Sequence, residues 1–172
     1  VALALVGATY ANGYVKNKVM EFVGPGVASL SADCRNGIDC MTTETTCWSS
    51  IWQTDGVTEE YLASHGRADA YKELKPADVA YYDGCIELDL SKIECMIALP
   101  MHPSYAYPIR ELKANAKDLL HEIETRANEQ LSGKVKMDLV SKVRADGSIY
   151  VDQGIVAGCS GGTYENLCAD RK

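Results

Sequence analysis

The chain lacks the features that mark several large classes of protein. No apolar run approaches the ~20 residues that a membrane-spanning helix needs, and no basic residues precede the apolar start Val1–Val6, so we expect neither a membrane span nor a signal peptide. Basic residues are also scarce, because 17 Lys and Arg stand against 24 Asp and Glu, giving a net charge of -7. Such a charge repels nucleic acid and anionic membrane surfaces, and we expect neither as a partner.

The seven cysteines lack the spacing of the common cysteine motifs. No Cys-x-x-Cys pair is present, which argues against a zinc ribbon, a thioredoxin-type redox site and a self-contained ferredoxin cluster. Their number is odd, and the composition is that of an ordinary core, with 47% hydrophobic residues, so a secreted disulfide framework fits poorly. We therefore expect reduced thiols and a cytoplasmic location.

At 172 residues the chain has the size of one domain or two small ones. Strand and helix signals alternate along it, which predicts an α/β fold with α/β/α layers and a short mixed sheet. The expected strands are Val1–Val6, Val19–Val23, Cys85–Leu90 and Ile149–Ala157. The expected helices are Thr58–Ser64, Pro76–Tyr81 and a long one from about Arg110 to Leu131.

Prolines between Leu99 and Pro108 predict an extended linker, because each proline biases the residue before it away from helix. We therefore expect residues 1–108 to form one region and residues 109–172 a second. The chain begins without Met and directly within its first expected strand, which suggests a piece of a longer protein.

The segment Val156–Glu165 places a thiol where an expected strand ends in a glycine-rich turn. Exposed backbone amides at such a turn favour a bound anion or a thiolate, so Cys159 could be a nucleophile, a metal ligand or part of an anion cradle. The alternative is a tight turn in which this cysteine merely packs. No lysine follows the glycines, which excludes a Walker motif.

A second candidate region, Asp33–Cys47, gathers acids, thiols and hydroxyls before Trp48. Glu44 lies among four threonines and could be a general base or a water-positioning group, or simply a solvated carboxylate. The cysteines of this region are six and seven residues apart, a spacing that suits packing better than metal binding. The three histidines are isolated from one another, and we expect each to make only local contacts.

Four motifs, in order, resemble the aconitase family of iron-sulfur hydro-lyases, and specifically its bacterial aconitase-like hydratase branch. Val19–Ser31 resembles the family's Val-Glu-Phe-x-Gly-x-Gly-Val-x-x-Leu-Ser segment, which precedes a helical stretch with an active-site glutamate. Ile86–Ser91 and His102-Pro103 resemble the strand and His-Pro stretch that close the second domain. Gly158–Glu165 resembles the Gly-Ser-Cys-Thr-Asn-Ser-x-Tyr-Glu signature. The resemblance implies an aconitase-type fragment, part of the second and the start of the third α/β domain.

The resemblance also implies roles for individual residues. Cys159 matches one of the three cysteines that hold the family's four-iron four-sulfur (4Fe-4S) cluster. Counting back from Trp52–Asp55 places Glu44 at the catalytic glutamate, which holds water and hydroxyl at the open iron. Ser160, in the same signature, is expected to contact substrate. Ser160 stands where threonine is usual and Cys40 where asparagine is usual, so we expect substrate contacts that differ from those made to citrate.

The implied function is that of a hydro-lyase that dehydrates and rehydrates a hydroxy polycarboxylic acid. Its partners would be that small substrate and the remaining aconitase domains of the same chain. Because the other cluster cysteines and the arginine- and serine-rich substrate and base residues lie elsewhere in the family, we expect this piece alone to bind no cluster and to be inactive. Two alternatives stay open: a non-catalytic α/β interaction or regulatory module, and a stand-alone enzyme with Cys159 as nucleophile.

Overall fold

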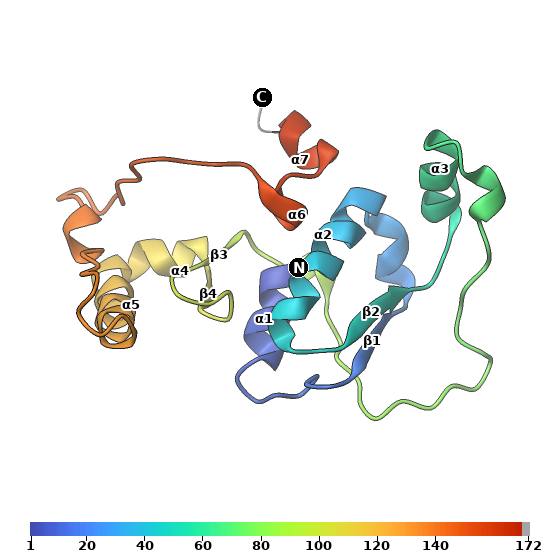
Figure 1. Cartoon of the computed structure of the whole chain (residues 1–172), viewed down its shortest axis with the longest axis horizontal. Helices are drawn as coiled ribbons and strands as arrows, with labels where there is room; N and C mark the ends of the chain where they lie inside the picture. The colour runs from blue at the N-terminus through green and yellow to red at the C-terminus, as the bar shows by residue number, and fades with distance from the viewer. Residues whose placement is uncertain (170–172) are drawn as a thin grey trace.

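A computed structural model describes residues 1–169 and shows a mixed α/β chain with two small sheets (Figure 1). Its strands are β1 (Val19–Phe22), β2 (Ser49–Trp52), β3 (Met96–Ala98) and β4 (Ala106–Pro108). Its α-helices are α1 (Ala2–Thr9), α2 (Ala32–Thr42), α3 (Gly56–Ser64), α4 (Ile109–Ala114), α5 (Ala116–Gln130), α6 (Gly158–Gly161) and α7 (Tyr164–Ala169). Short 3-10 turns are η1 (Pro25–Ser29), η2 (Thr43–Thr45), η3 (Ala68–Ala70), η4 (Leu90–Lys92) and η5 (Val140–Lys142).

The first sheet is a parallel pair, β1 beside β2, with Val19 opposite Ser49. Parallel neighbours need a long crossover, and α2 provides it. Helix α1 packs on α2, and a small core forms around Leu5, Val15 and Met20. This β-α-β unit fixes where α2 and the turn η2 after it lie.

The second core lies under the antiparallel hairpin of β3 and β4. Its buried side chains come from the hairpin and from α4 and α5, and they are Leu99, Leu112, Leu120 and Ile123. Helix α1 contacts β3 and β4 as well as α2, so it joins the two cores. Through α1 the hairpin is held close to the end of α2.

Several sequence expectations are confirmed. The fold is mixed α/β, the expected strand Val19–Val23 is β1 apart from its last residue, and Thr58–Ser64 lies within α3. Helix α3 begins earlier than expected, because the Asp55 carboxylate caps it by accepting the N–H groups of Val57 and Thr58.

The expected strand Val1–Val6 is wrong, because these residues begin the helix α1. A short apolar run suits a buried strand and a buried helix equally, and alternation of alanine with leucine supplies good helix formers. Helix α1 is apolar on several sides because α2 covers one of them and the β3–β4 hairpin another.

Two further expected strands are absent from the part of the chain that the structure describes. Cys85–Asp89 lies outside any helix or strand, Leu90 begins η4, and the Tyr14 hydroxyl accepts the Cys85 N–H at 3.2 Å. In Ile149–Ala157 only Ile149 makes a β-bridge, to Val143. An alternating pattern suits a strand, but a strand also needs a neighbour to bond.

The remaining corrections concern Pro76–Tyr81, the linker and the long helix. Pro76–Tyr81 is not helical, and its largest side chain, Tyr81, is 93% exposed, so no core supports a helix there. The expected linker Leu99–Pro108 instead supplies β4 and the hairpin turn. The long helix is divided into α4 and α5 at Asn115, whose side chain bonds the Glu111 carbonyl. The division of the chain at residue 108 stays a prediction.

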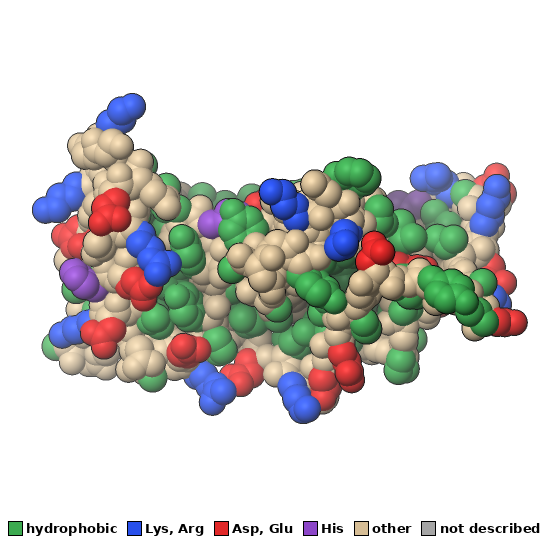
Figure 2. Space-filling view, turned by 90° about the horizontal axis from the view of Figure 1, so that it is seen from below, with side chains coloured by type: hydrophobic (Ala, Val, Ile, Leu, Met, Phe, Trp, Pro, Cys, Tyr) green, Lys and Arg blue, Asp and Glu red, His purple; other side chains and the backbone are tan. Residues whose placement is uncertain are grey.

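Hydrophobic side chains also appear on the surface, among charged groups of both signs (Figure 2). The most exposed large ones lie in loops or in segments outside the two cores, and they include Trp48, Val79, Tyr81, Val151, Ile155 and Tyr164. Within residues 1–169, no helix has both the length and the apolar character that crossing a membrane requires.

A buried ion pair anchors α2. Arg35 is only 5% exposed, and its guanidinium donates to the carbonyl oxygens of Val27 and Leu30 and to both carboxylate oxygens of Asp55, at 2.9 and 2.7 Å. The hydrogen bonds from Arg35 lower the pKa of Asp55 below its ordinary range. One aspartate therefore neutralises a buried cation and caps α3.

Replacing Asp55 by alanine should lower the free energy of unfolding by about 3 kcal/mol, because Arg35 would keep a buried charge without its counter-ion. Chemical denaturation of both proteins measures the change. Asp89→Ala is the matched control, since Asp89 caps η4 and pairs with Lys92 in solvent, and it should change stability little. Equal losses in the two variants would contradict the central role of Arg35.

The same pair predicts a pH dependence. The pKa of Asp55 is lower in the folded than in the unfolded chain, so its contribution to stability is complete above the unfolded value of about 4 and is lost as the pH falls through the folded value. The stability difference between the parent and Asp55→Ala should therefore narrow from pH 7 toward pH 3. A difference that is constant over this range would show that the charge does not matter.

Candidate functional site

Threonine side chains shape the turn that carries Glu44. Thr42, Thr43 and Thr45 each donate a hydrogen bond to the carbonyl three residues earlier, at 2.6 to 2.9 Å. These bonds satisfy carbonyl groups at the end of α2 and tighten the chain into η2. Thr45 is fully buried, whereas the Glu44 side chain is 43% exposed. The turn is thus fixed while its carboxylate stays accessible.

His102, in the hairpin turn, faces Glu44 from a distant part of the sequence. Its Nε2 lies 3.9 Å from Glu44 Oε2, too long for a direct hydrogen bond but within range of charge interaction or a bridging water. The His102 ring stacks on Tyr10, with ring centroids 4.0 Å apart. Tyr10 lies at the end of α1, so α1 and the hairpin together hold the histidine against η2.

Hydrogen bonding fixes the tautomer of His102. The backbone N–H of Ser104 donates to Nδ1 at 3.1 Å, so Nδ1 is the acceptor and the neutral ring carries its proton on Nε2. That N–H is the one on the Glu44 side. The arrangement therefore suits a carboxylate that is oriented by a neighbouring donor.

The glycine-rich turn forms α6, which docks on α2. The Ser160 hydroxyl donates to the Gly37 carbonyl at 2.9 Å, and an added Cβ at Gly37 would meet Ser160 atoms at 3.4 Å. The next helix, α7, continues the contact, because the Glu165 N–H donates to Asp33 at 2.8 Å and its carboxylate accepts from Ser31. Figure 1 shows α6 and α7 beside α2, reached by a long extended segment. These contacts thus join segments that are more than 120 residues apart in the sequence.

Docking of α6 brings two thiols together. Cys159, exposed on α6, lies next to half-buried Cys40 on α2, and burial together with the Cys159 thiol raises the pKa of Cys40. Cys40 lies four residues before Glu44, about one helical turn away. Cys159 thus lies against α2 near Gly37 and Cys40, and the Glu44–His102 pair follows in the turn after the helix.

The predicted site residues lie on or against α2 and the turn after it. Glu44 lies in η2 and Cys159 on α6, which contacts α2, and their predicted roles stay predictions. Ser160, predicted to contact substrate, donates its hydroxyl proton to α2, and its substrate role stays a prediction. His102 was expected to make loop contacts only; its approach to Glu44 depends on packing between α1 and the hairpin, which no local pattern reports.

The thiols set the number of cluster ligands that this site can offer. Among residues 1–169 no group of three or more His, Cys, Asp or Glu side chains converges in a way that could hold a metal ion. Cys159, with Cys40 beside it, supplies fewer thiolates than the three or four that a 4Fe-4S cluster takes. The donor set fits one contribution to a shared cluster, and it does not fit a cluster held by these residues alone.

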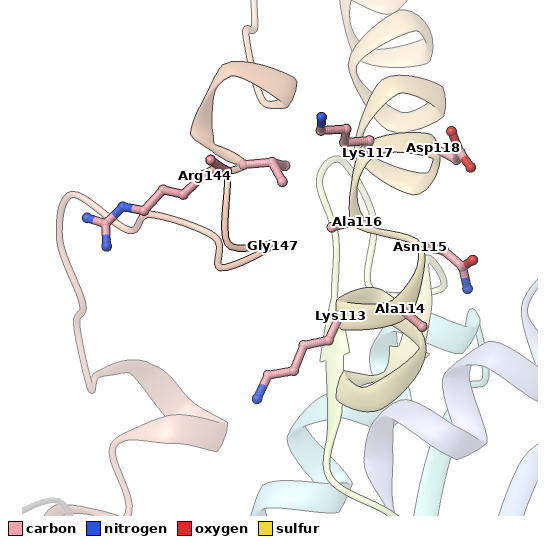
Figure 3. A pocket seen from close by; sticks show the side chains of 10 residues that line it. Lys113, Ala114, Asn115, Ala116, Lys117, Asp118, Arg144 and Gly147 are labelled. Carbon is pink, nitrogen blue, oxygen red and sulfur yellow. The ribbon is translucent and has the colours of Figure 1, made fainter.

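A shallow hollow elsewhere is not part of this site. It lies between the junction of α4 with α5 and the turn near Gly147, and Lys113, Lys117 and Arg144 line it (Figure 3). The side chains of these three residues point in different directions in Figure 3, and the guanidinium of Arg144 lies over the Tyr150 ring at 4.9 Å. None of the predicted site residues lines the hollow.

Comparison with known proteins identifies relatives that match between 49% and 87% of this chain. A 3-isopropylmalate dehydratase large subunit from Caldicellulosiruptor bescii is 28% identical over 150 residues, which are 87% of this chain and 27% of that protein. A 2,3-dimethylmalate dehydratase large subunit from Eubacterium barkeri is 38% identical over 84 residues, 49% of this chain and 20% of that protein. Aconitase htyD from Aspergillus rugulosus is 33% identical over 104 residues, 58% of this chain and 12% of that protein.

The chain thus spans between 12% and 27% of the length of these curated relatives. The family comparison is more extensive, because the Aconitase family (aconitate hydratase) matches residues 1–172, the whole sequence. The chain belongs to the aconitase family.

Proposed function

We propose that this chain supplies a cluster thiolate and a catalytic carboxylate to a hydro-lyase that acts on a hydroxy polycarboxylic acid by dehydration and rehydration. The observation that carries the proposal is the match of the whole chain to the aconitase family, whose members above are named as dehydratases of substituted malates. The placement of Cys159 against α2 and of Glu44 in the turn after α2 supports it, since a metal-assisted dehydration needs both kinds of group.

Glu44 would act at the hydroxyl group that leaves and returns. Its carboxylate can accept a hydrogen bond from that hydroxyl and exchange a proton with it. His102 Nε2–H would orient the Glu44 carboxylate from one side, which leaves the other oxygen for substrate or water. Buried Thr45 and the hydrogen bonds of its neighbours keep the turn from moving as the proton transfers.

Cys159 would provide one of several ligands of a 4Fe-4S cluster, which when bound supplies a Lewis-acidic iron that polarises the substrate hydroxyl. The other thiolates would come from further domains or subunits, in keeping with the short share of each relative that this chain covers. Ser160 would position the cluster cysteine by holding α6 on α2, and its predicted substrate contact would be an additional role. The cytoplasmic location stays a prediction.

The isolated 172-residue chain should hold no cluster and show no hydratase activity, because it lacks enough converging thiolates. Anaerobic reconstitution with iron and sulfide, followed by iron analysis and absorption spectroscopy, measures this. About four irons per chain with a thiolate-to-iron absorption band would overturn the proposed division of ligands.

In a cluster-loaded enzyme that contains this chain, Glu44→Gln and Cys159→Ser should fail in different ways. Glu44→Gln keeps shape but loses the charge, so kcat should fall by roughly 10² to 10⁴ with the cluster spectrum unchanged. Cys159→Ser removes a soft ligand and should lower cluster occupancy itself. Steady-state kinetics and iron content separate the two effects.

Glu60→Gln is the matched control, because Glu60 is an exposed glutamate on α3. It should leave both kcat and iron content at parent values. Near-full kcat in Glu44→Gln would make the carboxylate structural, and full cluster occupancy in Cys159→Ser would remove the thiolate from the ligand set.

His102→Phe tests the positioning role of the histidine, because phenylalanine keeps the ring that stacks on Tyr10 and removes the Nε2–H. A water-mediated hydrogen bond from Nε2–H to Glu44 is worth about 1 kcal/mol, so kcat should fall about fivefold. In the Glu44→Gln background the same change should have little further effect, as expected for residues that act together. Additive losses would show that His102 acts independently of Glu44.

A further inference from the structure

The contact between α6 and α2 gives Cys159 a specific thiol neighbour. Ser160 is bonded to Gly37, which lies three residues before Cys40 on α2, so Cys159 sits against the next turn of the same helix. This contact places Cys159, the residue before Ser160, within about one helical turn of Cys40, and the Cys159 thiol contributes to the raised pKa of Cys40. Their closeness depends on docking, because 119 residues separate them along the chain.

Other cysteines of the same region are held differently. Cys47 packs at the edge of the core around Leu5, and its thiol donates to the Thr42 carbonyl at 3.3 Å. Burial raises the pKa of Cys34, which is also half-buried on α2, and the charge of Glu165 on α7 adds to the rise. The contacts of Cys34 and Cys47 therefore differ from the contact of Cys40 with α6.

We propose that Cys40 and Cys159 are a redox-active thiol pair that closes to a disulfide when the chain meets a peroxide. Hydrogen peroxide oxidises the exposed Cys159 thiol to a sulfenic acid and releases one water. The Cys40 sulfur then attacks that sulfur, the S–S bond forms, and the hydroxyl leaves with the Cys40 proton as a second water. In total two thiols and one peroxide give one disulfide and two waters.

The backbone around α6 can accommodate this bond. A disulfide requires Cα atoms about 4.4 to 6.8 Å apart, so closing the bond needs α6 to be able to shift against α2. Helix α6 has only four residues, and the segment before it, 150–157, is exposed and outside any helix or strand. Small shifts of α6 toward α2 therefore disturb neither core.

The pair has a consequence that rests on the proposed function. A thiolate that is oxidised cannot ligate iron, so the disulfide would remove Cys159 from the ligand set until a thiol reductant restores it. The pair would thus make acceptance of the cluster depend on the redox state of the chain. Oxidation of the chain can itself be tested without any metal.

The test treats the reduced 172-residue chain with a small excess of hydrogen peroxide and counts its remaining thiols. Trypsin leaves Cys40 with Cys47 and Cys159 with Cys168, so Glu-C is added to cut after Glu44 and Glu165 and separate them. Non-reducing mass spectrometry should find the Cys40 peptide linked to the Cys159 peptide, and two of the seven thiols should be lost. Dithiothreitol should restore both.

Variants and unfolding provide the controls. Cys40→Ser and Cys159→Ser should each abolish the linked peptide, whereas Cys34→Ser, half-buried on the same helix, and Cys95→Ser, exposed elsewhere, should keep it. Peroxide treatment in guanidinium chloride should give disulfides between several different pairs of cysteines, because the contact between α6 and α2 is lost. The same selective pairing in denaturant, another pair in the folded chain, or no disulfide at all would overturn the proposal.

The outcomes separate this proposal from the proposed function. In one outcome the chain forms the selective disulfide while the Cys159→Ser variant of the larger enzyme still binds a full cluster. That combination would support the thiol pair and refute Cys159 as a cluster ligand. Loss of the cluster in Cys159→Ser without any Cys40–Cys159 disulfide would do the reverse.

Discussion

The bonds of the buried Arg35 guanidinium constrain the rest of this structure. A guanidinium cannot shed its charge, so burial is tolerable only if its N–H groups find acceptors. The turn before α2 supplies two carbonyl oxygens, and Asp55 supplies a bidentate carboxylate that also caps α3. These bonds fix α2 relative to the chain on both sides of it. The positions of the groups along the second half of α2 therefore depend on the hydrogen bonds of Arg35.

Local sequence signals predicted the elements that depend on local energies. The regular spacing of Leu112, Leu120 and Ile123 predicted helix, and all three are buried in one core. Elements that depend on a partner were predicted less well. Cys85–Leu90 alternates as a strand does, yet its hydrogen bonds depend on a neighbour that no pattern in those six residues encodes. The strand predicted at the apolar start of the chain was wrong for a related reason, since burial on several sides suits either a helix or a strand.

The candidate site divides along the same line. Glu44 and Cys159 were proposed from residue type and motif alone, and their roles stay predictions. The threonines around Glu44, which bond back along α2 and η2, are equally visible in the sequence. The approach of His102 to Glu44 joins residues 58 positions apart and depends on α1 packing against the hairpin. Its tautomer is set by a backbone N–H two residues away, a geometric fact that a sequence does not display. Partners across the fold are therefore what sequence reasoning missed.

The glycine within α2 connects stability to chemistry. Gly37 lies in the middle of the helix, where it costs about 1 kcal/mol relative to alanine. A Cβ there would lie 3.4 Å from the Ser160 carbonyl oxygen and 3.5 Å from its hydroxyl oxygen, which is ordinary van der Waals contact, so α6 lies directly on the helix surface at Gly37. The Ser160 hydrogen bond and the Glu165 contacts then offset part of the cost. Because Cys40 follows Gly37 by one turn, the same close approach that seats α6 also brings Cys159 to a second thiol. The glycine that lowers the helix propensity of α2 is thus also the residue on which α6 packs, and this packing brings Cys159 toward Cys40.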